Sequence, residues 1–301
     1  MASPTTPTHG KLGALYVLRP NGFSGIGLND VTWGAGFDGA ATAYYEVVID
    51  SELGGTAGVD TFKWRKDGGA WTENVDISGA AQTLSDSQTI TFAATKTHTL
   101  TDQWIIGNLK AEATTESGTG AQITTAGHRL LNPNSPPTFT DSEGETVLTI
   151  NYTNGTAVFS GNVGIVTVAG NNGYIPAAAL RKAAYLIDWS IDLSVDMADT
   201  SSMGNQWKTS LPGQAGGSGS ANAYFIASEM LYNCLAESIA AGDKYFLVEL
   251  FNYDPDQDQT GDHITAWVTF NNFSLSTTIG DVVKESLSYQ IEGLISFTAN
   301  A

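Results

Sequence analysis

A strict two-residue alternation over residues 187–197 constrains the fold of this chain more than any other feature. Successive residues of a β-strand point to opposite faces, so alternate positions share one face. The apolar set is Ile187, Trp189, Ile191, Leu193, Val195 and Met197, and the polar set is Asp188, Ser190, Asp192, Ser194 and Asp196. The pattern predicts a strand with one face in a core and the other in water.

Three carboxylates lie on the polar face, at Asp188, Asp192 and Asp196, and no basic residue interrupts them. Neighbouring carboxylates are about 13 Å apart along an extended strand. Glycoside hydrolysis needs two carboxyl groups about 5–9 Å apart, which this strand alone does not supply. Two interpretations remain open besides catalysis: an ordinary solvated sheet face, or a wall that repels anions.

The acidic charge is concentrated in the C-terminal half of the chain. Up to Leu131 there are 13 acidic and 8 basic residues, and after it there are 18 and 5. A field of this sign repels phosphates and anionic membrane surfaces. Tight binding of nucleic acid by that half is therefore excluded, and without an apolar run of 18 residues we expect no membrane partner.

The rest of the chain is also typical of a mainly β protein. Short apolar segments separated by turns predict strands at 12–18, 44–49, 61–65, 71–77, 89–92, 104–106, 163–168, 245–253, 264–273 and 285–297. The spacing over 44–106 is that of a small β-sandwich, with Phe62, Trp64, Trp71 and Trp104 as its expected core. The pair Asn154 and Gly155 predicts a hairpin of 146–152 with 156–160.

Other segments have weaker patterns. We expect residues 110–146 to be an irregular connection, 176–184 to include a short helix after Pro176, and the Gly-rich residues 213–220 to be a flexible loop. One α-helix is expected from a cap at Ser228 to Gly242. Its apolar face comprises Leu231, Cys234, Leu235 and Ile239, so Cys234 is expected to be a buried hydrophobe.

The sequence contains no pattern of residues typical of a catalytic site. His9, His98, His128 and His263 lack metal-like spacing, and there is no nucleophile elbow or phosphate-binding loop. We therefore expect no enzyme activity, no metal and no cofactor. The segment with Asp254, Asp256 and Asp258 has part of a calcium-loop spacing, which leaves weak cation binding as an alternative to a simple acidic turn.

Large apolar residues in the segment 203–213 indicate a contact between chains. Met203, Trp207, Leu211 and Pro212 lie in a stretch otherwise suited to exposure, and exposed Trp is enriched at the centres of interfaces. The alternative is that Trp207 packs under its own hairpin.

At three stretches the sequence resembles the major tail tube proteins of long-tailed, siphovirus-like bacteriophages. These are HGKLGALYV at 9–17, the strand from Tyr185 with VDMADTSS at 195–202, and MGNQWKTSLPG at 203–213, before a small-residue strand and a helix. The resemblance covers about 1–20 and 145–301. It implies a tail-tube-type β-sandwich or barrel with one flanking α-helix.

Residues 40–106 resemble a small Ig-like β-sandwich module found in phage structural proteins. Thr97 and Thr101 stand where that module often has glycine. Because tube-like segments precede and follow it, the module is interpreted as an insertion at 21–112. The tube domain would comprise 1–20, with an arm at 1–10, and 113–301.

The resemblance implies that copies of the chain form rings, hexameric in most relatives, which stack into a tube through which viral DNA leaves. The lumen would be lined by Asp188, Asp192, Asp196 and Glu292, with Met203, Trp207, Leu211 and Pro212 contacting neighbouring subunits or rings. Three-membered rings remain an alternative to six. Partners would be further copies and the tail terminator, tape measure and distal tail proteins.

DNA would pass through the tube without specific binding. Assembly would take place in the host cytoplasm, and the final location would be the virion. A phage surface adhesin or carbohydrate-binding β-sandwich protein is the alternative function, and a glycan-active enzyme is a second one.

Overall fold

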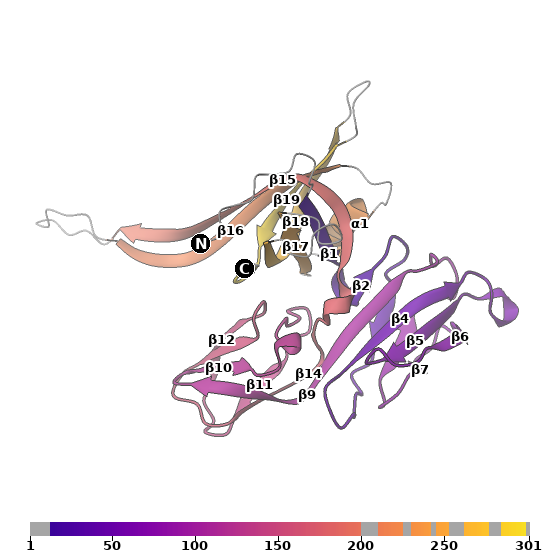
Figure 1. Cartoon of the computed structure of the whole chain (residues 1–301), viewed down its shortest axis with the longest axis horizontal. Coiled ribbons are helices and arrows are strands. Elements are labelled where there is room, and N and C mark those ends of the chain that lie inside the picture. Colours follow the sequence, from indigo (N-terminus) through magenta and orange to yellow (C-terminus); the bar gives the residue numbers. More distant parts are fainter. Residues whose placement is uncertain are drawn as a thin grey trace, which may run out of the picture.

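The computed structural model describes residues 13–199, 210–224, 230–241, 245–252, 262–276 and 284–298. Over these residues the chain is mainly β with one α-helix, as predicted. The strands form a barrel, from which a long two-stranded extension leaves, and two smaller β units beside it (Figure 1). We call the smaller ones the sandwich unit and the second unit.

The barrel consists of antiparallel strands from both ends of the chain. They are β1 (Gly13–Leu18), β15 (Arg181–Asp199), β16 (Ser210–Tyr224), β17 (Phe246–Phe251), β18 (His263–Ser276), β19 (Lys284–Ile291) and β20 (Ser296–Thr298). The order is β17, β1, β15, β16, β19, β18 and β20, and β17 also pairs with β18, which closes the sheet. The predicted strand at 285–297 is therefore two strands, separated at Gly293, whose φ is 84°.

β15 and β16 continue beyond the barrel as a ribbon, which we define as residues 193–199 and 210–216. β19 pairs with β16 only as far as Gly217, whereas β15 and β16 stay paired to Asp199 and Ser210. The whole segment predicted as a flexible loop, 213–220, is therefore part of strand β16. The glycines of this segment let the side chains of neighbouring strands come close to its backbone. The loop prediction considered only the composition of the segment and not these packing contacts.

The helix α1 (Met230–Ala241) packs against the barrel, and it lies within the predicted range. Leu231 and Cys234 are buried in the barrel core, as expected, and burial raises the pKa of the Cys234 thiol to about 12. Ile239 is 74% exposed, so its assignment to the same packed face was wrong. The predicted cap residues Ser228 and Gly242 lie outside the described residues.

The sandwich unit has two facing sheets. Its strands are β2 (Phe23–Ser24), β3 (Val31–Trp33), β4 (Ala43–Ser51), β5 (Thr61–Lys66), β6 (Thr72–Asp76), β7 (Gln82–Thr83), β8 (Thr89–Phe92) and the first half of β9 (Gln103–Ser117). Phe62 and Trp104 are fully buried, as predicted, and burial of Phe62 alone contributes about 2 kcal/mol. Trp71 is not a core residue, because it lies against the cations of Lys63 and Arg65.

The second unit occupies the region predicted to be irregular. It contains the second half of β9 with β10 (Gly120–Ile123), β11 (Thr138–Asp141), β12 (Val147–Asn151), β13 (Thr156–Phe159) and β14 (Val166–Tyr174). β12 and β13 form the predicted hairpin at Gly155. Because β9 runs unbroken across residue 112, strand pairing groups residues 113–174 with the sandwich unit and not with the barrel strands. The prediction had placed residues 113–301 together in the tube domain.

The link from the second unit to the barrel contains no α-helix. Only a single 3-10 turn at Ala177–Ala179 occurs within the predicted 176–184 segment. The expected short helix is thus present only as this single 3-10 turn, because Arg181 and Lys182 already pair with β1 as part of β15.

A shared apolar cluster and several polar contacts attach the smaller units to the barrel. Leu247 and Trp267 of the barrel pack with Ile105 and Ile175. Asn29 Nδ2, between β2 and β3, donates to Glu237 Oε1 of α1 at 3.1 Å, and Asn233 Nδ2 of α1 donates to the carbonyl oxygen of Ile26 at 2.9 Å. These contacts place the acidic strand at a defined position relative to the sandwich unit.

Candidate functional site

The polar face of β15 continues across three further strands. Residues directly opposite one another in adjacent strands point to the same face, and three such rows cross β15, β16, β19 and β18. The rows are Asp188, Asn222, Ser286 and Ser274, then Ser190, Ser220, Ser288 and Asn272, then Asp192, Ser218, Gln290 and Thr269. All twelve side chains are acids, amides or hydroxyls, so the face is hydrophilic and carries only negative charge.

Neutral groups, not cations, contact the carboxylates of this face. Asn222 Nδ2 donates to Asp188 Oδ1 at 2.6 Å, and Thr269 Oγ1 donates to Glu292 Oε1 at 3.4 Å. Asp192 and Asp196 are exposed. One basic residue lies at the edge of this face: Lys284 is two residues before Ser286 on the same side of β19, and it lines a small pocket together with Asp188 and Asn222.

The structure places three of the four predicted acidic residues in or beside the polar rows. Asp188 and Asp192 lie in the rows, and Glu292 follows β19 beside Thr269 of the third row. Asp196 lies further along, on the ribbon. Glu285 lies on the opposite, core-facing side of β19, where burial raises its pKa to about 7.

Small residues on β16 determine how the opposite face packs. The Tyr289 ring lies over Gly219, where an added Cβ would come within 2.5 Å of the ring. The Tyr289 hydroxyl reaches across to donate to the carbonyl oxygen of Ser190 at 3.2 Å. Burial raises the pKa of that hydroxyl, which keeps it a neutral donor.

The apolar side chains of β15 are only partly covered. Trp189 and Ile191 pack against the barrel core. Ile187, Leu193 and Val195 are 39%, 61% and 48% exposed, so the expectation that this whole set lies in the chain's own core was wrong. The sequence pattern is correct, but the barrel ends near Gly217 and a bulge displaces Ile187.

An apolar groove lies at the base of the ribbon. It has a volume of about 420 Å³ and is lined by residues of the ribbon, of the end of β19 and of the segment after it, among them Leu193, Val195, Ala215, Ile291 and Leu294. Leu294 is 63% exposed. Sequence analysis did not identify this groove, because residues 291–295 and Leu193 are brought together only by the pairing of β16 with β19.

The predicted contact residues lie at or beyond the far end of the ribbon. Leu211 and Pro212 are in β16, opposite Ala198 and Met197 of β15. Met203 and Trp207 lie outside the described residues, as do Asp254, Asp256 and Asp258. Their roles in contacts or cation binding stay predictions.

The described residues offer no centre of metal chemistry. No group of three or more His, Cys, Asp or Glu side chains that could hold a metal occurs in the described ranges. His98 is buried between Asp60 and Asp30, at 3.0 and 3.2 Å, within the sandwich unit. None of the helices in the described ranges has the length and apolar character needed to cross a membrane.

No protein-family model matches the sequence, and no curated protein matches it. Solved structures that match part of this chain include the tail of an empty gene transfer agent particle with C6 symmetry, at 17% identity and a TM-score of 0.32, covering 41% of this chain and 89% of that one. A chain from the virion of a native gene transfer agent particle has 18% identity and a TM-score of 0.32, covering 40% and 91%.

A third structure is the 6-fold symmetrised baseplate of the anti-feeding prophage. It has 10% identity and a TM-score of 0.31, and covers 40% of this chain and 84% of that one. Because the TM-scores of all three structures are low, the interpretation of the site is based on the surface of this chain alone.

Proposed function

We propose that this protein is a structural subunit of a bacteriophage tail, and specifically of the tail tube. Copies of the chain would form rings, of six by our prediction, that stack around a channel lined by the polar face. The observation that carries the proposal is the combination of that face, which is wholly hydrophilic over four strands, with an uncovered apolar ribbon beside it.

The polar face suits a channel for DNA because its three described rows carry carboxylates and no cation, and Lys284 at its edge adds a single positive charge beside Asp188. Each copy would contribute Asp188, Asp192, Asp196 and Glu292, and the ring would multiply this charge. Like charge raises the energy of a bound phosphate backbone, whereas Lys or Arg would bind it by releasing counterions. DNA would therefore slide through without specific binding.

The ribbon suits assembly because it is incomplete by itself. From Gly216 toward Ser210, the described residues provide no strand that pairs with either outer edge of the ribbon. Unpaired edges and exposed apolar side chains are features that soluble monomers normally avoid. A neighbouring copy that pairs with an edge and covers Leu193 and Val195 would remove both.

The other parts of the proposal follow from this arrangement. The sandwich unit would project away from the bore, because it attaches at the end of the barrel where β1 meets β2. Tail terminator, tape measure and distal tail proteins would contact the tube ends or lumen, the protein would reside in the virion, and it would have no catalytic activity.

Negative-stain electron microscopy of the purified chain at high concentration, with and without tail-assembly factors, tests the proposal. We expect rings or tubes, with class averages down the axis that give the ring number. Monomers alone under all conditions would contradict it. So would an assembly in which Asp188 and Asp192 lie on the outer rim or pair with lysines of a neighbouring copy.

A further inference from the structure

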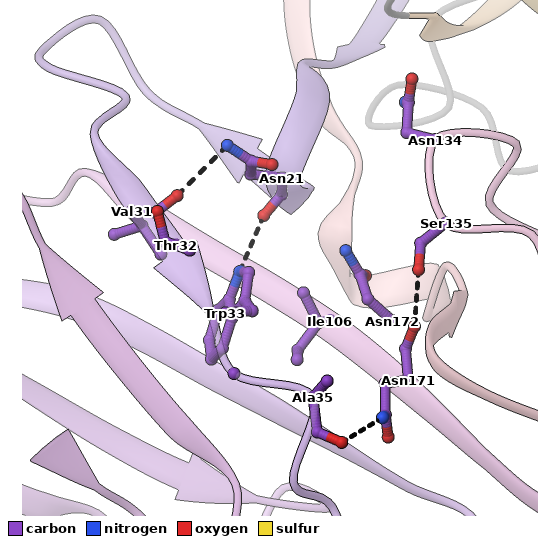
Figure 2. A pocket seen from close by; sticks show the side chains of 11 residues that line it. Asn21, Val31, Thr32, Trp33, Ala35, Ile106, Asn134, Ser135, Asn171 and Asn172 are labelled. Carbon is purple, nitrogen blue, oxygen red and sulfur yellow. Dashed lines mark hydrogen bonds between the residues drawn. The ribbon is translucent and has the colours of Figure 1, made fainter. Parts of the chain in front are cut away.

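A cavity of about 360 Å³ lies between the sandwich unit and the second unit, away from the polar face and the ribbon. One wall consists of Asn21 and the segment 31–35, and the other consists of 134–135 with Asn171 and Asn172 of β14. Ile106 of β9 lies between them. Figure 2 shows Asn21 and Trp33 on one side of Ile106 and the two adjacent asparagines on the other.

Two layers of hydrogen bonds fix the separation of the walls. At the surface, Asn171 Nδ2 donates to the carbonyl oxygen of Ala35 at 2.5 Å (Figure 2). Ser135 Oγ donates to the carbonyl oxygen of Asn171 at 2.7 Å, which holds the second wall. These two bonds tie the second wall of the cavity to the first.

The second layer lies behind the cavity and uses two side chains that are completely buried, Gln88 and Asn108. The Asn172 backbone N–H donates to Asn108 Oδ1 at 2.7 Å, and Asn108 Nδ2 donates to Gln88 Oε1 at 2.8 Å. Gln88 Nε2 then donates to the carbonyl oxygen of Gly34 at 2.9 Å. Buried amides are costly unless they are fully bonded, and here they join one wall to the other.

The side chain of Asn172 is the free polar group of this cavity. Its Oδ1 atom is buried and has no hydrogen-bond partner among the described residues. The backbone at Asn172 has a φ of 52°, in the left-handed region, because residues 171–173 bulge out of the pairing of β14 with β9. The unpartnered buried oxygen costs about 1–3 kcal/mol, and rotation of the amide toward the cavity would let a ligand bond to it and offset that cost.

The lining restricts the chemistry of the ligand. The eleven described residues that line the cavity include no Asp, Glu, Lys, Arg or His, although the chain has a net charge of −18. A charged ligand would be desolvated there without a counter-charge, and a purely apolar one would leave Asn172 unpaired. The side chain of Trp33 adds a half-buried aromatic surface.

We propose that this cavity binds a neutral saccharide unit. Asn172 would exchange hydrogen bonds with adjacent sugar hydroxyls, Asn21 and Thr32 would contact further hydroxyls, and the Trp33 indole would pack against the C–H face of the ring. A volume of about 360 Å³ falls within the range of small-molecule sites. The site is independent of ring assembly, because the two units that form it belong to one chain.

Titration of the full chain with maltotriose, lactose, mannobiose and diacetylchitobiose tests the proposal, with sialyllactose as an acidic comparison and glycerol as a non-specific one. We expect at least one neutral saccharide to bind and Asn172→Gly to weaken it about tenfold or more. Glycine tolerates the left-handed backbone, so this variant removes the amide without straining the bulge. Asn74→Gly is the matched control, because Asn74 is an exposed asparagine with a φ of 57° in β6, and it should leave the affinity within about twofold.

Absence of binding for every neutral saccharide at about 10 mM would overturn the proposal, as would a preference for sialyllactose. Equal affinity of Asn172→Gly and the unaltered chain would place binding elsewhere and also overturn it. Self-association that Asn172→Gly abolishes, without saccharide binding, would assign the cavity to a second copy instead.

Discussion

The side-chain amide of Asn222 donates a hydrogen bond to the carboxylate of Asp188 across 2.6 Å, between strands β16 and β15. An amide is neutral, so the bond orients the carboxylate without cancelling its charge. A lysine at this position would form an ion pair and remove a negative charge from the face. The other side chains in the three rows are also neutral amides or hydroxyls, so they do not cancel the negative charge of Asp188 and Asp192.

Reversal of that charge should turn a non-binding channel into one that retains DNA. We expect tubes of the double variant Asp188→Lys with Asp192→Lys to retain duplex DNA at about 50 mM salt and to release it as salt rises. Tubes of the unaltered chain should not retain it. Co-sedimentation of tubes with labelled DNA measures the difference.

Glu73→Lys with Glu143→Lys provides the matched control, because both residues are exposed outside the barrel and the net charge changes equally. Equal DNA retention by the two double variants would show that the effect is one of total charge. The polar face would then not line a channel.

A charge on the apolar ribbon should prevent assembly without unfolding the subunit. Leu193 is 61% exposed, so Leu193→Asp should change the free energy of unfolding of the monomer by less than about 0.5 kcal/mol. In a ring the same carboxylate would be buried without a partner and should abolish ring formation. Electron microscopy and thermal melting measure the two effects separately.

Ile165→Asp is the control for the ribbon, because Ile165 is an apolar residue of the second unit that is 73% exposed. It should leave assembly intact. Loss of rings in both variants would indicate a general effect of surface charge, and a large drop in the Leu193→Asp melting temperature would show that Leu193 supports the monomer.

Trp207→Ala should weaken stacking of rings while the monomer melts as before. This expectation comes from the sequence, since Trp207 lies beyond the described end of the ribbon, between Asp199 and Ser210. Tube length in micrographs and the monomer melting temperature are the two measurements. An equal fall in both would mean that Trp207 packs within its own chain.

The stability of the sandwich unit should depend on pH through His98. The neighbouring Asp30 and Asp60 carboxylates raise the pKa of His98 despite its burial, and hydrogen bonds from Leu53 and His98 lower the pKa of Asp60 despite the opposing effect of burial. A raised histidine pKa contributes stability that is complete below the ordinary value of about 6.5 and is lost as pH rises through the raised value. A lowered carboxyl pKa contributes stability that is present above about 3.9 and is lost as pH falls through the lowered value.

The contribution of this triad should therefore be greatest between about pH 4 and 6.5. Urea unfolding at pH 5.5 should show His98→Gln to be less stable by about 3 kcal/mol, because two buried carboxylates then lack their cation. The difference should shrink toward pH 9. A difference that is constant over this range would mean that His98 acts by shape alone.

Thr101→Gly should stabilise the sandwich unit. Thr101 has a φ of 73° and Thr97 one of 78°, in the region that β-branched residues rarely adopt. The backbone strain costs about 1–3 kcal/mol, and the extra freedom of glycine in the unfolded chain costs about 0.5–1 kcal/mol. We expect a net gain of about 1 kcal/mol in chemical unfolding, and a loss of stability would show that the hydroxyl or methyl group matters more.

Local sequence patterns determined much of this fold. Alternation identified β15 and its acidic face, the Asn-Gly pair located the hairpin of β12 and β13, and helical spacing located α1. The resemblance to the Ig-like module placed Thr97 and Thr101 where that module often has glycine, and both residues have positive φ. Each of these features depends on residues close together in the chain.

Tertiary structure alone decided where the apolar face of β15 is covered and where it is bare. The alternation at Leu193 is the same as at Ile191, but only Ile191 reaches the barrel core. The Gly-rich segment became a strand because Tyr289, some 70 residues away, packs over Gly219. The neutral cavity likewise arises from segments near residues 33, 106 and 172. Strand pairing joins residues distant in sequence, and the energy of those long-range contacts is not encoded in any local period.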